Sequence, residues 1–211
     1  MTSSDAAQRT APGVPPRAAQ RTPTVITWQG GSPATLESTR LLVTDSRLRA
    51  SGRLIAAATA DREAYSASFE AAVDKGEASG RLLLRTTTAD EERQISLSRT
   101  EDGVWLVDHG TASERGDFSG AVAVDVAGAV TFTTLPIRRL GVHREAGEFE
   151  IPVVRVSMPD LSVSLVTQVF RTVSLDEGGA VVAIGDPGSP AEVRVDADGI
   201  VVDFPGTARR V

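Results

Sequence analysis

The sequence predicts a soluble protein of the mainly β class, and three observations carry that prediction. From Thr24 onward, apolar and polar residues alternate in short segments, and a period of two places successive side chains on opposite faces of a sheet. Turn-forming pairs such as Asp102-Gly103 and Asp198-Gly199 separate these segments, as in β-hairpins. Aromatic residues make up only 4% of the chain, so we expect an aliphatic core rich in valine, which favours sheet.

The alternating segments define about a dozen short strands with regularly spaced turns, a pattern typical of all-β domains. In the segment 65–73, for example, Tyr65, Phe69 and Val73 share one face, while serines and a glutamate take the other. The clearest strands are expected at residues 25–28, 48–58, 65–73, 94–98, 104–107, 122–126, 150–158, 161–171, 180–184, 193–195 and 200–202.

Helix signals are scarce. The alanines in 62–73 would tolerate a helix, but the period-two alternation favours a strand there. The best helix candidate is 135–140, with Thr134 as its N-cap, Pro136 in its first turn and Gly141 at its end.

The length of 211 residues fits one large domain better than two. Residues 1–23 are rich in Ala, Pro, Thr, Gln and Ser and contain almost no large apolar side chain. Such a segment cannot bury enough surface to offset its ordering entropy. We therefore expect a disordered tail at 1–23 and a single folded domain at 24–211.

Composition excludes several classes of function. The net charge of −6 argues against nucleic acid as the main partner, because phosphate binding requires a clustered positive field. The absence of cysteine removes disulfides, thiolate nucleophiles and cysteine–metal sites. No apolar run approaches the ~20 residues of a membrane span, and the N-terminus lacks the apolar region of a signal peptide. The expected location is the cytoplasm.

Three charged residues are candidates for chemistry: Arg138, Arg139 and Asp125. Adjacent helical residues point about 100° apart, so the two arginines cannot share one role. One of them could hold a phosphate or sugar-acid oxygen of a ligand. The structural alternative, which we favour, is that one pairs with a buried carboxylate such as Asp125 or Asp203, because an unpaired buried charge is costly.

Catalytic and metal chemistry have weaker support. Glycosidase chemistry needs two facing carboxylates, for which Asp125 and Asp203 are the candidates. The two histidines, His109 and His143, lie beside glycines in expected loops and are interpreted as surface residues. We expect no metal, because metal sites usually need several such ligands together, and no cofactor, because no phosphate-binding glycine motif is present. Trp28 is either a core anchor or part of an apolar ligand cleft.

Several motifs occur in an order that resembles the putative glycolipid-binding family, a domain of unknown function. Its members carry a D-V-D strand, a T-N-T-L-P-I-R-R-L core, a Q-x-Y strand and a closing G-L-V-x-D-Y-P before arginines. The matching segments here are 120–126, 131–140, 168–170, 195–206 and 209–211. The sequence departs from the family where Phe132-Thr133 occupies the region of the usual Asn, and where Phe170 and Phe204 replace tyrosines.

The resemblance implies a single-domain spiral β-roll of many antiparallel strands wrapped around one short helix. It also implies a non-catalytic carrier of a glycolipid or other amphiphile, and a homodimer. Two other functions stay open: an enzyme acting on a sugar or lipid ester through Asp125 and Asp203, and a protein-interaction module without a small ligand. The ligand-binding residues expected are Arg138, Arg139, Asp125, Gln168, Asp203 and Trp28.

Overall fold

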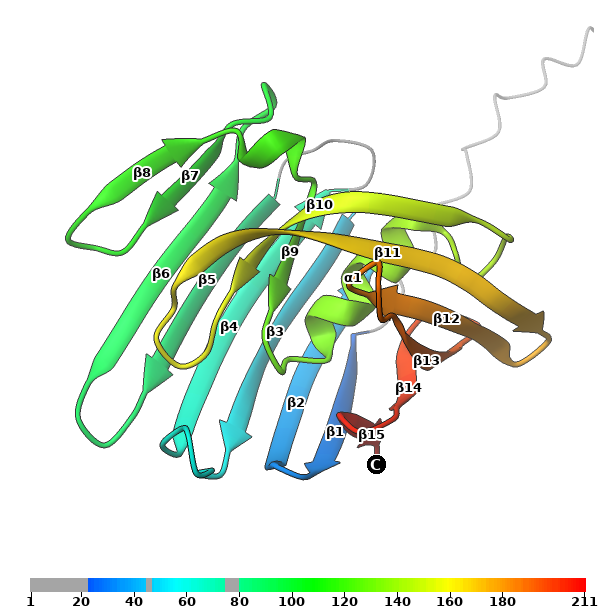
Figure 1. Cartoon of the computed structure of the whole chain (residues 1–211), viewed down its shortest axis with the longest axis horizontal. Coiled ribbons are helices and arrows are strands. Elements are labelled where there is room, and N and C mark those ends of the chain that lie inside the picture. Colours follow the sequence, from blue (N-terminus) through cyan, green and yellow to red (C-terminus); the bar gives the residue numbers. More distant parts are fainter. Residues whose placement is uncertain (1–22, 45–46, 75–79) are drawn as a thin grey trace, which may run out of the picture.

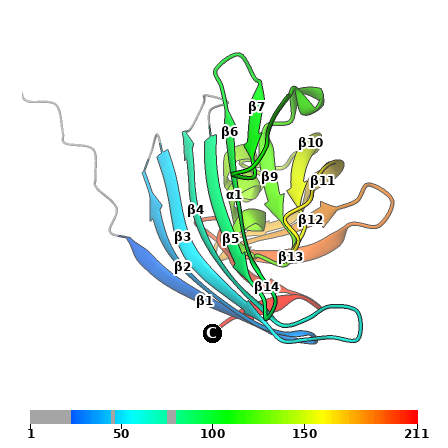
Figure 2. The same cartoon turned by 90° about the vertical axis from the view of Figure 1, so that its left-hand side faces the viewer.

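The structure of the protein is a computed structural model that describes residues 23–44, 47–74 and 80–211. The expected disordered tail, apart from its last residue, lies outside the described residues. The described strands form one sheet of 15 strands that is not closed into a barrel. The sheet curls around one helix, α1 (Thr131–Leu140), as Figures 1 and 2 show. The predicted mainly β class and β-roll are confirmed.

The N-terminal half of the sheet is a meander in which each strand pairs antiparallel with the next. Its strands are β1 (Thr24–Gly31), β2 (Ala34–Val43), β3 (Arg47–Ala56), β4 (Tyr65–Asp74), β5 (Gly80–Thr87), β6 (Glu92–Arg99), β7 (Trp105–Asp108) and β8 (Ser113–Gly116). This half forms the broad curved wall at the left of Figure 2.

The C-terminal half begins with a short 3-10 turn, η1 (Phe118–Gly120). Its strands then pack around α1 (Figures 1 and 2). The parallel pair of the sheet joins β9 to β10. The halves meet where β1 pairs with β15, with Trp28 opposite Arg210. The remaining strands are β9 (Ala123–Val126), β10 (Glu148–Val156), β11 (Val163–Asp176), β12 (Gly179–Gly185), β13 (Ala191–Asp196), β14 (Val201–Phe204) and β15 (Ala208–Arg210).

The core lies between the concave face of the sheet and α1. On β4, Tyr65, Ala67 and Phe69 are buried, whereas Ser66 and Glu70 are exposed. This confirms that alternation, rather than the helix propensity of alanine, decides the structure of the segment. Phe69 also contacts Phe132 of α1 edge to face, with ring centroids 5.2 Å apart, a geometry that aromatic pairs favour.

The helix begins earlier than the sequence indicated. Thr134 is not its cap: α1 begins at Thr131, and Pro136 lies inside it. Its N-cap residue, Val130, has no side-chain cap hydrogen bond. The first N–H groups of the helix, which have no partner within the helix, must therefore find acceptors elsewhere. The predicted end is confirmed, because Gly141 adopts the left-handed conformation with φ of 76°.

Candidate functional site

A buried carboxylate from the sheet supplies the acceptors that the start of α1 lacks. Glu37, on β2, is 2% exposed. Its carboxylate accepts hydrogen bonds from the backbone N–H groups of Val130 and Thr131 and from the Thr131 hydroxyl. The Thr39 hydroxyl also donates to Glu37 at 3.3 Å. Three of these hydrogen bonds come from Val130 and Thr131 at the start of the helix, so Glu37 anchors α1 to the wall of the roll.

Burial sets the protonation behaviour of Glu37. Desolvation raises the pKa of its carboxyl above the ordinary value of 4.5, and the hydrogen bonds from Thr131, Val130 and Thr39 oppose that rise. The group is surrounded by donors from the protein itself. Its hydrogen-bonding capacity is therefore used for structure, and it offers little to a ligand.

A second polar cluster lies where β9, β10 and β11 run side by side. Asp125 on β9 and Arg155 on β10 are opposite each other in the parallel strand pair, and Arg155 Nε donates to Asp125 Oδ2 at 2.8 Å. From β11, Gln168 Nε2 donates to the same oxygen at 3.1 Å. We call these three residues the polar triad. The Asp125 and Arg155 side chains keep 18% and 30% of their surface exposed, so solvent reaches them.

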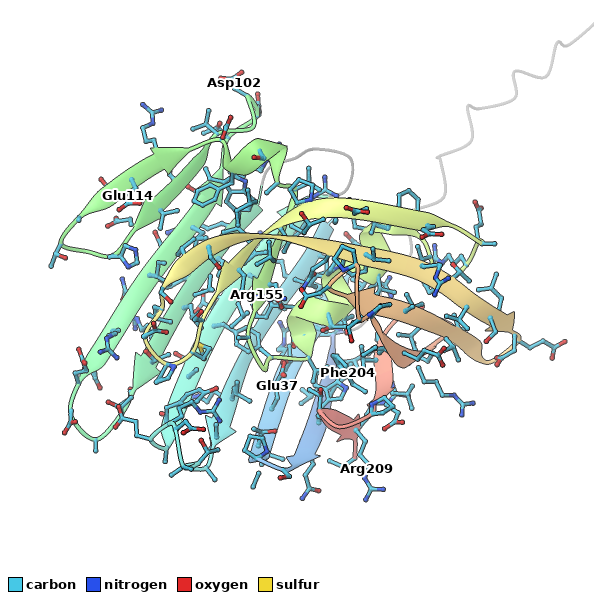
Figure 3. The ribbon with its side chains drawn as sticks, in the orientation of Figure 1. Glu37, Asp102, Glu114, Arg155, Phe204 and Arg209 are labelled. Atoms are coloured by element: carbon cyan, nitrogen blue, oxygen red, sulfur yellow. The ribbon has the colours of Figure 1, made fainter. Side chains whose placement is uncertain are left out.

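The polar triad lines a pocket of about 380 Å³ between α1 and the C-terminal half of the sheet. Figure 3 labels Arg155 and Phe204, which line this pocket from β10 and β14. Most of the other lining residues are apolar, and three of them are phenylalanines. The apolar lining comprises Val126, Ala127, Ala129, Val130, Phe132, Phe170, Ile184 and Phe204. The pocket thus combines a few polar side chains, the polar triad with Thr133 and Thr207, with a largely apolar lining, as small-molecule sites commonly do.

The polar triad keeps spare hydrogen-bonding capacity. Asp125 uses Oδ2 for both of its contacts, Arg155 uses Nε and Gln168 uses Nε2. Asp125 Oδ1, the terminal nitrogens of Arg155 and Gln168 Oε1 make no hydrogen bond to the residues that the structure describes. An arginine fork can bind a carboxylate, phosphate or hydroxyl pair, and the other two oxygens can accept from hydroxyls.

The arginines of α1 are placed differently from the prediction. The partner of Asp125 is Arg155, so the expected pairing of Asp125 with Arg138 or Arg139 is wrong. Strand register brings Arg155 to Asp125, whereas Arg139 Nη1 donates to the Val122 carbonyl at 2.6 Å. Neither helix arginine lines the pocket of the polar triad.

Arg139 borders a separate apolar cavity of about 50 Å³, between α1 and strands β4, β5 and β7. Its neighbours there include Trp105, Leu135 and Pro136. Desolvation, together with the positive charge of Arg99, lowers the pKa of Arg139 from its ordinary value. Arg138, in the last turn of α1, is half-buried.

Two other predicted residues lie away from the triad. Trp28 is 1% exposed, and its indole N–H donates to the Val201 carbonyl at 2.8 Å, which ties β1 to β14. It is a core anchor rather than a wall of the pocket. Asp203 is exposed on β14 and does not line the pocket, because its neighbour Phe204 takes the inward side. The structure therefore does not bring Asp203 to Asp125.

The histidines also differ from each other. His109 is exposed as expected, but His143 is 4% exposed, so its interpretation as a surface residue was wrong. The turn after α1 folds His143 inward, where Nδ1 lies 3.2 Å from the Ile137 carbonyl. Burial lowers its pKa below 6.5. In the described part of the chain, no cluster of three or more His, Cys, Asp or Glu residues could hold a metal ion.

Sequence reasoning missed Arg155 and Glu37, although each left a signal. Arg155 interrupts an apolar strand, Val153-Val154-Arg155-Val156, in the same way as Asp125 interrupts its own. Glu37 shares its period-two face with Thr39 and Leu41, and that face is buried. A charged residue on a buried strand face needs a partner, and this rule would have pointed to both.

The fold and the pocket define a class: an open β-roll that curls around a short helix and carries a largely apolar pocket with a polar triad in its lining. The chain belongs to the family described as putative glycolipid-binding, whose sequence model matches residues 25–210. A crystal structure of a DUF1089 family protein from Pseudomonas aeruginosa, at 1.80 Å resolution, shares the fold. That match has a TM-score of 0.68 and 19% identity, and covers 97% of this chain and 100% of that one. No curated protein matches the sequence.

The family description supports a binding role for this chain and does not extend to a named ligand. In the part of the chain that the structure describes, no helix is long and apolar enough to cross a membrane.

Proposed function

We propose that the chain binds a glycolipid or a related amphiphile without catalysing a reaction on it. The polar head lies against Asp125, Arg155 and Gln168, and the apolar part lies against the wall formed around Phe132, Phe170 and Phe204. The observation that carries this proposal is the pocket of about 380 Å³ whose largely apolar lining includes the polar triad.

The chemistry of the triad matches a sugar or anionic head. A carboxylate oxygen and an amide oxygen accept from hydroxyls, while a guanidinium donates to hydroxyl, phosphate or carboxylate oxygens. The Asp125–Arg155 contact holds both side chains in place before a ligand arrives, which lowers the ordering cost of binding. The volume falls within the range of about 300–1,000 Å³ that is usual for small-molecule sites.

An enzyme acting on a sugar or lipid ester is supported less well. The carboxylate that lines the pocket is Asp125, and it already accepts two hydrogen bonds. The second carboxylate of that hypothesis, Asp203, lies outside the pocket. Hydrolysis of a glycoside needs two carboxyl groups flanking one bond, and this pocket does not supply the second.

The test is a binding titration with a soluble alkyl glycoside below its micelle concentration, compared with the alcohol of the same chain length. We expect the glycoside to bind and Arg155→Ala to weaken it at least about tenfold, since loss of a charged hydrogen bond costs roughly 1.5–3 kcal/mol. Arg194→Ala, at an exposed site on β13, is the matched control. Equal binding of glycoside and alcohol, or equal affinity in wild type and Arg155→Ala, would overturn the proposal.

Two further statements belong to this proposal. We expect the protein to act in the cytoplasm, in keeping with a chain that has no cysteine. We also expect a homodimer, which the family resemblance suggested. Analytical ultracentrifugation of the purified protein over a range of concentrations tests the second statement, and a monomer at all concentrations would contradict it.

A further inference from the structure

The outer face of the N-terminal wall has a charge opposite to that of the whole protein. In β2 to β5, side chains that point away from the core alternate with the buried ones. We call this outward side the arginine face. The charged residues on it with described side chains are Arg40, Arg49, Arg53, Arg81, Arg85 and Glu70. Five arginines with one glutamate form a positive region in a chain of net charge −6.

Strand register concentrates these arginines. Arg53 and Arg85 share one cross-strand row with Ser68 between them, and Arg49 and Arg81 share another row with Ala72 between them. Two shallow hollows of about 330 and 540 Å³ lie over this region, and Arg40 lines both.

Glu70 lines both hollows together with Arg40, but the described carboxylates form no ion pair with these arginines. Within the described part of the chain, Arg40, Arg53 and Arg85 form no ion pair. Among the described residues, Arg85 donates a hydrogen bond from its Nε to the neutral side chain of Gln94. Unneutralised arginines on a sheet that repeat across neighbouring strands repel one another, and an anionic partner relieves that repulsion.

The same face exposes aliphatic side chains. Val25 is 68% exposed and lies opposite Arg40 on the neighbouring strand. Leu36 and Ile55, which oppose each other on β2 and β3, are 46% and 57% exposed. Arginines combined with exposed aliphatic side chains are typical of surfaces that lie in the headgroup region of a bilayer.

The arginine face is also open. Figure 2 shows that α1 and strands β9 to β13 lie on the opposite, concave side of the wall. The aromatic residues of β4, Tyr65 and Phe69, point into that core and are 4% and 3% exposed. Single-stranded nucleic acid binds through aromatic side chains on which bases stack, and the described outward residues of β2 to β5 include none.

We propose that the arginine face docks the protein on a membrane surface that carries anionic lipid headgroups. The arginines contact phosphate and carboxylate oxygens, the serines between them donate hydroxyl hydrogen bonds, and Val25, Leu36 and Ile55 enter the interfacial layer. This proposal is independent of the polar triad, which lies on the other side of the wall. It gives a protein that binds an amphiphile a way to approach the membrane from which the amphiphile comes.

The experiment is vesicle flotation of the whole chain with phosphatidylcholine vesicles, alone and mixed with phosphatidylserine. We expect binding to the mixed vesicles only, weakening as salt is raised. The double variant Arg53→Glu/Arg85→Glu should bind at least about tenfold more weakly, since each arginine near an anionic surface contributes measurably. Arg53→Lys/Arg85→Lys should retain most of the binding, because the charge is kept.

The matched control is Arg171→Glu/Arg194→Glu, which makes the same charge change at exposed sites of the C-terminal half. It should bind like wild type. Circular dichroism and thermal melting of each variant separate loss of docking from loss of fold. Equal flotation with neutral and anionic vesicles, or equal weakening by both charge reversals, would overturn the proposal. So would failure of wild type to float with either vesicle, including the case in which it binds a single-stranded RNA oligomer instead.

Discussion

Two carboxylates near α1, Glu37 and Asp125, have their hydrogen bonds satisfied by the protein in different ways. Glu37 is 2% exposed, and donors from α1 and β2 surround it. The Asp125 side chain is 18% exposed, and its contacts to Arg155 and Gln168 converge on a single oxygen. The first carboxylate is closed to ligands, whereas the second keeps an open oxygen beside a partly exposed guanidinium.

Burial and completed hydrogen bonds therefore distinguish a charge that serves the structure from a charge that can bind a ligand in the same fold. A charge that is fully buried must have its hydrogen bonds completed by the protein, because an unsatisfied group there is costly. A charge at the edge of a pocket can leave bonds for a ligand, because water completes them meanwhile. Changes at Glu37 should therefore act on folding, and changes at the polar triad should act on binding.

The largest expected effect is on stability, from Glu37→Ala. We expect the free energy of unfolding to fall by about 3 kcal/mol or more, because two N–H groups at the start of α1 lose their acceptor in a buried site. Urea unfolding measures this directly. Glu92→Ala, at an exposed position on β6, is the control and should change stability by less than about 0.5 kcal/mol. A similar small change in both variants would remove the distinction between the two carboxylates.

The next effect separates binding from folding at the other carboxylate. Arg155→Ala should lower stability by only about 1 kcal/mol, because its ion pair is partly exposed and screened by solvent. The same change should weaken binding of the alkyl glycoside at least about tenfold, or roughly 1.4 kcal/mol. Urea unfolding and titration of one preparation give both numbers. A larger loss of stability than of affinity would place Arg155 among the structural charges.

A third effect is the pH dependence from Glu37. Because the pKa of folded Glu37 is raised above 4.5, the folded state holds its proton more tightly than the unfolded state. The stabilisation from that proton is fully present below 4.5 and is lost as the pH rises through the raised pKa. Unfolding free energies of wild type and Glu37→Gln, measured across the acidic and neutral range, should therefore differ in slope. Parallel curves would contradict the assignment.

The smallest effect comes from His143, which titrates with the opposite sign. Burial lowers its pKa below 6.5, so the folded state prefers the neutral ring. Its contribution to stability is present above 6.5 and is lost as the pH falls through the lowered pKa. His143→Gln should flatten this part of the stability curve, and urea unfolding between neutral and mildly acidic pH checks it. An unchanged slope in the variant would show that His143 is not the group responsible.

Much of the fold could be predicted from local sequence. Alternation identified β4 against its helix propensity, and Gly199, with φ of 73°, occupies the turn predicted from Asp198-Gly199. Gly141 ended the helix where expected. The boundaries were less accurate: the helix began at Thr131 rather than near Leu135, because its first N–H groups are satisfied by Glu37 on a distant strand.

The candidate site could be predicted only in part. Asp125 and Gln168 were both predicted as site residues, and in the structure Gln168 Nε2 donates a hydrogen bond to Asp125 Oδ2. Their contact with Arg155 was not predicted, because we expected Asp125 to pair with Arg138 or Arg139, the arginines of the family motif. The need of a buried charge for a partner suggested those residues, whereas strand pairing decided the partner of Asp125.

The sequence by itself determined the β class, the positions of several turns and the inward face of each clear strand, because these depend on neighbours within a few residues. Only the tertiary structure decided which charges meet. Glu37 and Thr131 are separated by 94 residues, and Asp125 and Arg155 by 30. Such contacts depend on sheet register and on how the roll closes over α1, so local pattern leaves them open.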